Sequence, residues 1–439
     1  MCGVYFTNRN ESAKSDKNFL LRGPDCFNQV ESEGIIMCHS LLSLTGEFTK
    51  QPIEQSDVKL IFNGQIYNYD NQAYSSDSYF VLNEYLTKDL NFWESLDGEY
   101  AVVIHDKKKE VVVFATDIFG TKPLFYCIDN GKISISSLTS TLKMNNHKNI
   151  IKCSPNTLYT FNLSTNELTI QSNYFKFKLD QYKTNFDDWN DKFIESIKKR
   201  FGELKHEIIL PLSSGHDSGA IACAFELLDI KYYSYSILRG EHKKILTSRL
   251  IKRLATSPSK SRIRKDLQNA NIRDEVLNHI KNNSDPFFYG PAIDSLSING
   301  IEDPGAIGLS YILNKAKKMS NKIKIVASGQ GGDEIYSNNQ NYTFDKPNPQ
   351  YFTNNLEDIF PWQNFFYGAQ MSYLSKEESI GGSHGLETRY PFLDKELVQE
   401  YLSLSPDIKN KFYKSPITNF LKINGYPYRN DEGKSGFNP

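Results

Sequence analysis

The sequence predicts a mixed α/β protein with two domains, an antiparallel β domain followed by a parallel α/β domain. Its 439 residues exceed the length of one ordinary domain. The first third contains short apolar or β-branched runs bounded by turn residues, which is typical of antiparallel strands. After residue 186, apolar runs are separated by long helical segments, which favours a parallel sheet. We place the boundary between residues 175 and 186.

The composition excludes several classes of protein. With 39% hydrophobic and 23% charged residues, the chain is globular rather than disordered. Its 51 basic and 52 acidic residues leave a net charge of −1, so we expect no nucleic-acid or membrane partner. No apolar run approaches the roughly 20 residues of a bilayer span, and the first residues lack a secretory signal. Six cysteines without a CxxC pair indicate reduced thiols, so we expect a cytoplasmic protein.

Five short runs predict the strands of the first domain. The Asn130-Gly131 pair between the last two runs is a strong hairpin signal. Residues 106–109 close a second predicted hairpin. The predicted strands are residues 58–62, 101–105, 110–115, 124–128 and 132–136.

The second domain begins with an amphipathic helix. Apolar side chains at helical spacing over residues 186–201 predict one buried face, formed by Trp189, Phe193, Ile194 and Ile197. A stretch rich in serine and basic residues, 257–265, is expected to be a solvated loop or a helix start. No aromatic platform flanks it, so a nucleic-acid arm is disfavoured. Further along, strands are predicted at 207–212, 232–238 and 322–327, with a helix at 220–228.

Cys2 is a candidate nucleophile. If Met1 is removed, the exposed α-amine, with an ordinary pKa near ~8, belongs to the same residue as the thiol and can act as its general base. Such a site needs donors for a tetrahedral oxyanion, and the Asn63 side-chain amide with the Gly64 backbone N–H is a suitable pair. Asp77 can accept a substrate ammonium.

Several motifs occur together and in order. The segments MCG, RGPD, CHSLLS, NGQIYN and DIFGTKPLFY resemble the N-terminal-nucleophile (Ntn) glutaminase domain of class II amidotransferases, specifically that of asparagine synthetases. The resemblance implies an αββα Ntn-hydrolase sandwich over residues 1–178. It implies that Cys2, Asn63 and Gly64 are catalytic, and that Arg22, Asp77 and Gln65 bind the substrate.

Two positions depart from that family. Leu41 stands where the family usually carries an arginine that pairs with the glutamine α-carboxylate, and leucine cannot replace a bidentate cation. Gln65 stands where the family carries a glutamate that helps to hold the α-ammonium. Either Arg22 or another residue takes over, or glutamine binds weakly, or the amide donor differs. We expect slow glutamine hydrolysis with a high KM.

Two loops rich in serine and glycine follow predicted strands. Residues 213–219 form a tight turn before a helix, which suits a pyrophosphate, although the G-K-[ST] ending of a Walker A loop is absent. An aspartate in an anion-binding turn makes sense when a divalent cation bridges it to the phosphates, so Asp217 predicts Mg²⁺. Alone, the turn could equally lack a ligand. A second loop, 328–334, carries Asp333 and favours a site held from two sides.

The second half of the chain carries a second resemblance. SSGHDS, SGQGGDE and HGLETRYPFLD are similar to the SGGxDS, SGEGxDE and GxExRxPFLD elements of the asparagine synthetase synthetase domain. This domain is a pyrophosphatase-loop (PP-loop) ATPase. The resemblance implies an adenine-nucleotide α-hydrolase-like parallel α/β domain with added helices over residues 186–439. It also implies Mg²⁺ on Asp217 and Asp333. The ATP and pyrophosphate contacts implied are Leu212, Ser213, Ser214, Gly215, Asp217, Ser218, Ile237, Ser328, Gly329 and Asp333.

Other positions in this half of the chain bear on catalysis and on binding of the acceptor substrate. Lys434 matches the family's catalytic lysine in a KxGF-like element, and Lys414 matches a more peripheral lysine. Gln330, assigned to the acceptor substrate, replaces a family glutamate, and an amide cannot accept a proton at neutral pH. Glu387 and Arg389 form either a structural ion pair or part of the catalytic machinery.

These features predict a glutamine-hydrolysing, asparagine synthase-like carbon–nitrogen ligase. It would use glutamine, ATP and a carboxylate, most simply aspartate, through an acyl-adenylate attacked by ammonia from the Cys2 site. One alternative is amidation of a different carboxylate, such as a metabolite or sugar acid. Another is an ATP-dependent cyclase or ligase of β-lactam-synthetase type with a vestigial glutaminase domain. A binding protein without activity would be expected to have lost Asp217, Asp333 and Lys434. A homodimer is an expectation from the family alone.

Overall fold

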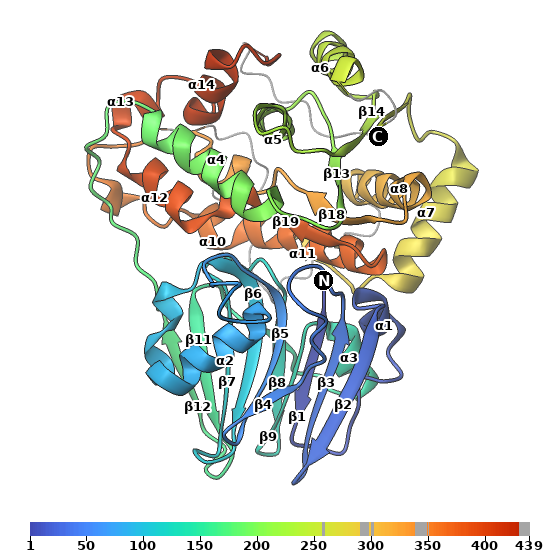
Figure 1. Ribbon diagram of the computed structural model, residues 1–439, viewed down its shortest axis with the longest axis vertical. Helices are drawn as coiled ribbons and strands as arrows, with labels where there is room; N and C mark the ends of the chain where they lie inside the picture. Colours follow the sequence, from blue (N-terminus) through green and yellow to red (C-terminus); the bar gives the residue numbers. More distant parts are fainter. Residues whose placement is uncertain (257–259, 290–297, 300–302, 339–348, 350, 430–439) are drawn as a thin grey trace. The chain divides into compact units, whose positions relative to one another are not determined.

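The computed structural model describes residues 1–256, 260–289, 298–299, 303–338, 349 and 351–429. The chain divides into two compact units (Figure 1). The first unit contains Met1–Lys176 with the short segments Asn283–Pro286 and Gly382–Leu386, and the second contains the rest of the described chain. The mixed α/β class, with a parallel sheet in the C-terminal part, is confirmed.

The first unit is built on two antiparallel sheets, each with six strands in the described chain. In spatial order, one sheet contains β10 (Ile151–Lys152), β8 (Phe125–Asp129), β9 (Lys132–Ser136), β1 (Gly3–Thr7), β3 (Ile35–Leu41) and β2 (Cys26–Ser32). The other contains β12 (Leu168–Ser172), β11 (Thr157–Asn162), β7 (Val111–Thr116), β6 (Gly98–Asp106), β5 (Val58–Ile66) and β4 (Ile53–Gln55).

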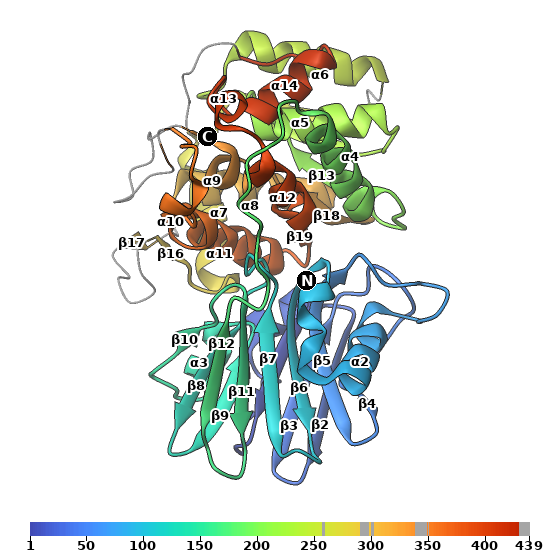
Figure 2. The same cartoon turned by 90° about the vertical axis from the view of Figure 1, so that its left-hand side faces the viewer.

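The two sheets pack face to face, with helices on both outer faces. Val4 and Phe6 of β1 belong to the core between the sheets, whereas Tyr5 faces the opposite side, as strand alternation requires. The outer face of the β1 sheet is covered by α1 (Lys17–Arg22) and α3 (Thr139–Met144). The outer face of the other sheet is covered by α2 (Asp77–Lys88), as Figure 2 shows. The predicted αββα layering is therefore present.

The largest departure from the predicted strands concerns β5. The sequence predicts that this strand ends at residue 62, because polar residues and a glycine follow. β5 instead continues to Ile66, because β6 pairs with it as far as Gly98. Gly64 has a φ of +133°, and a Cβ there would lie 2.0 Å from the Glu99 backbone oxygen, so only glycine fits. The predicted Asn130-Gly131 turn is present, with positive φ at both residues.

The second unit contains a parallel sheet with five strands among the described residues. In spatial order they are β15 (Ser261–Arg264), β14 (Tyr233–Ile237), β13 (Glu207–Pro211), β18 (Ile323–Ala327) and β19 (Glu387–Arg389). A separate antiparallel pair consists of β16 (Phe288–Tyr289) and β17 (Ile298–Asn299). Because β13 and β18 are parallel neighbours, the loops that follow them lie at one edge of the sheet.

Helices occupy most of the remaining second unit. Its α-helices are α4 (Asp187–Phe201), α5 (His216–Leu227), α6 (Lys243–Thr256), α7 (Ala270–Asn283), α8 (Pro304–Met319), α9 (Gly332–Tyr336), α10 (Gln363–Phe366), α11 (Gly368–Ser383), α12 (Lys395–Ser403), α13 (Pro406–Lys409) and α14 (Ser415–Ile423). Short 3₁₀ turns occur at Asp89–Asn91 and Trp93–Ser95 in the first unit, and at Leu356–Asp358 and Pro391–Leu393 in the second.

Two predictions for the second unit have different outcomes. In α4, Trp189, Phe193 and Ile197 are buried as predicted, while Ile194 is half-buried. The loop or helix start predicted for residues 257–265 is wrong over Ser261–Arg264, which form β15. This short strand pairs with β14 at the sheet edge, where the exposed Arg262 is compatible with strand structure and discourages further pairing.

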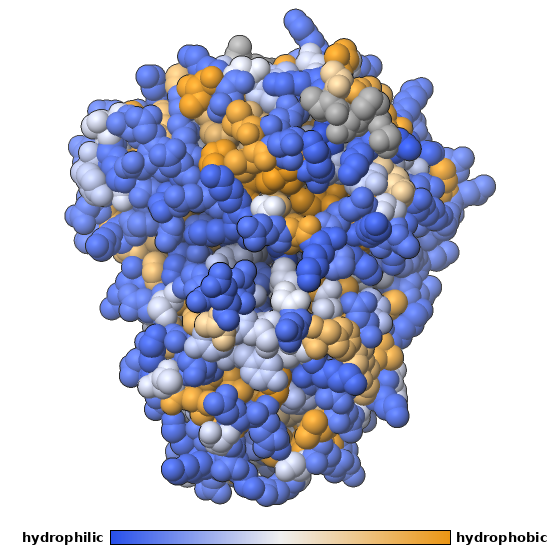
Figure 3. Space-filling view, in the orientation of Figure 1, coloured by the Kyte–Doolittle hydropathy of each residue, from blue (hydrophilic) through white to orange (hydrophobic). Residues whose placement is uncertain are grey.

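Among the helices that the structure describes, none combines the length and apolar character needed to cross a membrane. The face drawn in Figure 3 is mostly hydrophilic, with hydrophobic residues gathered over the α5 and β13 region of the second unit.

Candidate functional site

Cys2 lies just before β1, and its hydrogen-bond partners come from β5 and from the residue after β3. Its backbone N–H donates to Asn63 Oδ1 of β5 at 2.8 Å, and the Leu42 N–H beyond β3 donates to Cys2 Sγ at 3.4 Å. The residue is only 8% exposed. The Cys2 thiol can in turn donate to the Leu42 oxygen, which lies 3.8 Å from Sγ, so the backbone of Leu42 holds the sulfur in place. This environment suits a nucleophile.

Asn63 has a buried donor with no hydrogen-bond partner among the described residues. Its Oδ1 accepts from Cys2, which fixes the amide, and its Nδ2 is left unpartnered. An unpaired buried N–H costs about 1–3 kcal/mol, so such a group calls for an explanation. A substrate oxygen beside the Cys2 thiol would satisfy it.

Asp77 and Gln65, two residues predicted to bind the substrate, are in contact. Gln65 Nε2 donates to Asp77 Oδ2 at 3.1 Å, and the Ile66 N–H donates to the same oxygen at 3.2 Å. Gln65 Oε1 accepts from the Thr45 hydroxyl. The carboxylate of Asp77 lies in the first turn of α2, where negative charge is favoured. The pair therefore carries one negative charge.

Arg22 has a different neighbourhood. Its Nε donates to the Cys2 backbone oxygen at 3.0 Å, and its side chain is buried. Arg22 therefore holds the backbone of the candidate nucleophile. Leu41, at the end of β3, is also buried.

In the second unit, the loop after β13 leads into α5. Gly215 is the N-cap of α5 and brings no capping side chain, so the first turn of the helix faces the loop. The Ser213 and Ser218 hydroxyls lie 2.8 Å apart. Arg249 from α6 donates through one nitrogen to the backbone oxygens of Ser213 and Gly215, at 2.7 Å each. The loop is thus fixed from the α6 side.

Ser214 is engaged with a carboxylate. Its N–H donates to Glu241 Oε2 at 2.6 Å, and its hydroxyl donates to the same oxygen. A carboxylate on this loop N–H shows that the loop can bind an anionic oxygen. Ser214 stands where the compared motif has glycine, and its hydroxyl provides the second of these contacts.

The loop after β18 packs directly against the first loop. A Cβ on Gly329 would lie 2.7 Å from Asp217 Cβ, and one on Gly332 would lie 2.3 Å from Asp217 Oδ1. Gly331 has a φ of +92°, a conformation that side chains disfavour. Glycine is therefore required for the close approach of the two loops.

The two predicted metal ligands, Asp217 and Asp333, converge on one cation of the chain. Lys414 Nζ lies 2.7 Å from both Asp217 carboxylate oxygens and 2.7 Å from Asp333 Oδ1. The Tyr413 hydroxyl donates to the same Asp333 oxygen at 2.9 Å. Burial opposes the charge on Lys414, but the two carboxylates outweigh it and hold its pKa well above the usual value. Two carboxylates and one ammonium leave one net negative charge.

His216, the first residue of α5, adjoins this cluster. Burial, reinforced by the charges of Lys414 and Arg249, lowers the pKa of His216 to about 3. Its ring packs edge-on against Tyr413, with 5.6 Å between the ring centroids. The imidazole is therefore neutral near neutral pH.

The other predicted contacts of ATP follow the same sheet edge. Leu212 follows β13, and its N–H donates to the Tyr235 oxygen of β14 at 3.0 Å, while Ile237 is the last residue of β14. Ser328 follows β18, and its N–H donates to the Arg389 oxygen of β19 at 3.0 Å. These residues gather at the carboxyl ends of parallel strands, where ligands of such sheets bind.

The sequence singles out four further residues, three of which the structure describes. Gln330 Nε2 is buried and has no hydrogen-bond partner among the described residues. Glu387 and Arg389 form a buried ion pair with 2.9 Å between Oε1 and Nε, which accords with the structural alternative for these two residues. Lys434 lies outside the described residues.

Sequence reasoning underrated Lys414 and missed Arg249. Lys414 was assigned a peripheral position, yet it lies between the two carboxylates that the sequence singled out. Its only sequence signal is the resemblance of the segment around it. Arg249 carries no signal, because an arginine in a basic helix is normally solvated.

Comparisons with known proteins agree with this arrangement. Residues 1–188 match the family model of the glutamine amidotransferase domain, and residues 362–415 match that of asparagine synthase. The first match covers most of the first unit, and most of the second match lies within the second unit. The chain is therefore similar to asparagine synthetases in both of its units.

The relatives are distant but cover most of the chain. A Methanocaldococcus jannaschii protein, named as a glutamine-hydrolyzing asparagine synthetase, is 27% identical over 85% of this chain and 70% of its own length. Asparagine synthetase B [glutamine-hydrolyzing] of Escherichia coli is 25% identical over 88% of this chain and 71% of its own. Among solved structures, the B. subtilis glutamine phosphoribosylpyrophosphate amidotransferase, complexed with ADP and GMP, covers 53% of this chain and 65% of its own at 13% identity. Its TM-score is 0.34.

Proposed function

We propose that the protein is a glutamine-dependent ligase that uses ATP to amidate a carboxylate, most simply aspartate to asparagine. The observation that carries the proposal is the convergence of Asp217 and Asp333 on Lys414 at the carboxyl edge of the parallel sheet. The printed names of the relatives, glutamine-hydrolyzing asparagine synthetases, support the reaction class. No comparison supports the cyclase alternative.

The proposal assigns one half-reaction to each part of the chain. Residues 1–178 would form the glutaminase domain and residues 186–439 the synthetase domain. The match of residues 1–188 to the glutamine amidotransferase model supports the first assignment. The parallel sheet with two acidic loops at one edge supports the second.

In the glutaminase reaction, the Cys2 thiol attacks the carbon of the donor amide. After removal of Met1, the α-amine takes the thiol proton and passes it to the leaving ammonia. Asn63 Nδ2 and the Gly64 N–H stabilise the tetrahedral oxyanion, and the unpartnered state of Nδ2 supports this role. Water then hydrolyses the thioester, which releases glutamate and regenerates the thiol.

The proposed binding site for the amide donor has an acceptor for its ammonium but no cation at position 41 for its carboxylate. Asp77 is the acceptor for the donor ammonium, with Gln65 beside it. Leu41 offers no charge for a carboxylate. Glutamine hydrolysis is therefore expected to be slow, with a high KM.

In the synthetase reaction, an oxygen of the acceptor carboxylate attacks the α-phosphorus of ATP and pyrophosphate leaves. Ammonia then attacks the acyl carbon of the adenylate, and AMP leaves with formation of the amide. Lys414 provides positive charge near the departing pyrophosphate. We assign Lys434 to the same task at the α-phosphate. Gln330 Nε2, an unpartnered donor, suits an oxygen of the acceptor carboxylate.

The residues present fit a magnesium ion. Asp217 and Asp333 offer carboxylate oxygens, the ligands that Mg²⁺ prefers, and both approach one cation already. These two residues would hold Mg²⁺ together with the phosphates of ATP. The ion would neutralise charge on the leaving pyrophosphate.

The proposal is tested by measuring pyrophosphate release with a panel of carboxylates, each supplied with glutamine or with ammonium. Aspartate is expected to support release with either nitrogen donor, and ammonium is expected to be the better one. Asp217→Asn and Asp333→Asn are expected to abolish release while leaving glutamine hydrolysis intact. Wild-type release by both variants would overturn the proposal.

A further inference from the structure

A second cluster of reactive side chains lies in the first unit, away from the nucleophile. Cys127 packs with Tyr5 on the outer face of the β1 sheet, in the layer beneath α1 and α3. Cys2 shares the strand parity of Val4 and Phe6, which face the other sheet. The Cys127 cluster is therefore on the opposite face from Cys2, and the glutaminase reaction does not use it.

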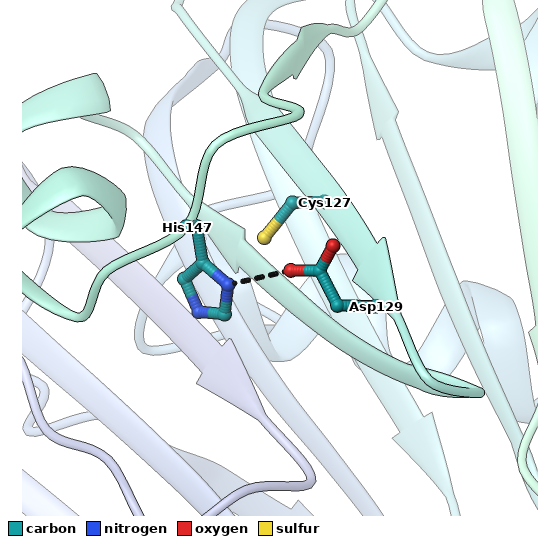
Figure 4. Close-up of side chains that lie close together, drawn as sticks. All are labelled: Cys127, Asp129 and His147. Carbon is teal, nitrogen blue, oxygen red and sulfur yellow. Dashed lines mark hydrogen bonds and ion pairs between the residues drawn. The ribbon is translucent and has the colours of Figure 1, made fainter.

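Three side chains of this cluster present ligand atoms to one another. Cys127 and Asp129 are two residues apart on β8, so they share a face of the strand. His147 follows α3, and its N–H donates to the Leu142 oxygen at 3.1 Å, which holds the loop. Figure 4 shows the three side chains pointing toward one another. The Cys127 sulfur, one Asp129 oxygen and a His147 nitrogen all lie within 4.8 Å of one another.

The imidazole of His147 is held from both sides. Its Nδ1 lies 3.0 Å from Asp129 Oδ2, and its Nε2 lies 2.9 Å from Glu11 Oε2. The same Glu11 oxygen accepts from the Tyr5 hydroxyl at 3.1 Å and the Ser134 hydroxyl at 3.3 Å. A fixed carboxylate on the second ring nitrogen is the usual partner of a metal-bound histidine. Nδ1 is thereby directed at Cys127 and Asp129.

We propose that Cys127, Asp129 and His147 bind one zinc ion, through Sγ, a carboxylate oxygen and Nδ1. Thiolate, imidazole and carboxylate together favour zinc over magnesium or calcium, and three protein ligands leave a fourth position for water. Glu11 acts outside the coordination sphere by accepting from Nε2–H.

Charge balance agrees with a divalent ion. Arg9 donates to the Asp129 backbone oxygen and lies 3.8 Å from its carboxylate. With zinc bound, the Cys127 thiolate and the Asp129 and Glu11 carboxylates carry three negative charges, which zinc and Arg9 neutralise. Zinc binds the thiolate, so it displaces the proton of the Cys127 thiol. Binding therefore weakens in acid.

The ion would have a structural role. It would connect the β8–β9 hairpin to the loop after α3, which the contact between Asp129 and His147 already joins. Since a metal that binds only the folded state adds to its stability, zinc is expected to raise the unfolding temperature of the first unit. Glutamine hydrolysis at Cys2 is expected to be unaffected at temperatures where the unit stays folded.

The proposal is tested by titrating the chelator-treated, full-length protein with Co²⁺, a spectroscopic substitute for zinc. One equivalent is expected to produce a thiolate-to-cobalt charge-transfer band and the visible bands of a tetrahedral site, both removed by zinc. Cys127→Ser is expected to lose the charge-transfer band. Cys38→Ser, which alters another buried thiol of the same layer, and Cys2→Ala are expected to keep it. Glu11→Gln is expected to weaken zinc binding about 10- to 100-fold.

Absence of a charge-transfer band in the wild-type protein would overturn the proposal, as would a band that persists in Cys127→Ser or disappears in Cys2→Ala. If Cys127→Ser does not fold, Asp129→Asn serves instead, because its side chain is 31% exposed and tolerates the change. Unchanged cobalt affinity and unchanged visible bands in Asp129→Asn would then contradict the proposal.

Discussion

We propose two roles for Asn63, one for each end of its side-chain amide. Its oxygen accepts from the Cys2 N–H, and its buried nitrogen has no partner among the described residues. A purely structural asparagine in a buried strand would be expected to have both ends satisfied. The unpaired donor beside the thiol is therefore best explained by an oxyanion that forms only during the reaction.

Asn63→Ala is expected to lower the kcat of glutamine hydrolysis about 10²- to 10³-fold, because one donor to the oxyanion is lost. Cys2→Ala is expected to abolish the reaction. Glutamate release measures both effects, and Asn91→Ala, at an exposed position, is the control that should keep the wild-type rate. Undiminished ammonia release by Cys2→Ala would rule out the nucleophile.

Lys414 is a cation that contacts the aspartates of both acidic loops. Lys414→Met is expected to slow pyrophosphate release at least about 10²-fold and to destabilise the second unit, because two half-buried carboxylates lose their cation. Lys411→Met removes an exposed lysine nearby and should change neither property. Equal pyrophosphate release by both variants would show that Lys414 takes no part.

The two loops function together only if β13 and β18 bring them into contact. Gly332→Ala would place a Cβ 2.3 Å from Asp217 Oδ1, so either the Asp217 carboxylate or the second loop must shift. We expect weaker ATP binding and slower AMP formation, with unchanged glutamine hydrolysis. Gly425→Ala is the matched control: its φ is +59° but nothing lies within 4 Å, so it costs only about 1–2 kcal/mol of backbone strain. Calorimetric titration with ATP distinguishes the two variants, and equal affinities would contradict the packing argument.

Local patterns predicted some elements well because local forces determine them. β9 and the Asn130-Gly131 turn follow from alternation and turn chemistry, and α4 follows from its apolar spacing. β5 extends beyond its apolar run because β6 continues to pair with it, which is a nonlocal effect. β15 has a polar sequence that is strand-like only at the edge of an existing sheet. These elements could not be derived from their own residues.

The candidate sites also depend on nonlocal contacts, between residues that lie far apart in the sequence. Cys2, Asp217 and Asp333 are recognisable because each lies in a distinctive motif. Lys414 is 197 residues from Asp217, and only the fold brings them together. The cluster of Cys127 and its neighbours has no sequence motif, since its histidine comes from a separate loop.

Acid stability depends on histidines that the fold buries in neutral form. Burial lowers the pKa of His39 to about 4, whereas an unfolded histidine titrates near ~6.5. Between these values the unfolded chain binds a proton that the folded chain excludes, so stability falls as the pH drops below about 6.5. The loss from His39 is expected to reach about 3 kcal/mol by pH 4.

His39→Gln removes this titration and retains a side-chain N–H donor for the Phe62 oxygen, which the ring nitrogen contacts at 3.0 Å. Urea denaturation of the two proteins between pH 7 and pH 4 should therefore show a shallower loss of stability in the variant. Identical pH dependence in both would contradict the assignment.

The whole account rests on the formation of an acyl-adenylate in the second unit. The most direct measurement uses aspartate with ¹⁸O in its side-chain carboxylate, together with ATP and ammonium, and resolves the nucleotide products by mass. The account predicts AMP and pyrophosphate in equal amounts, with one ¹⁸O transferred to AMP. ADP with phosphate, or AMP without the label, would contradict it.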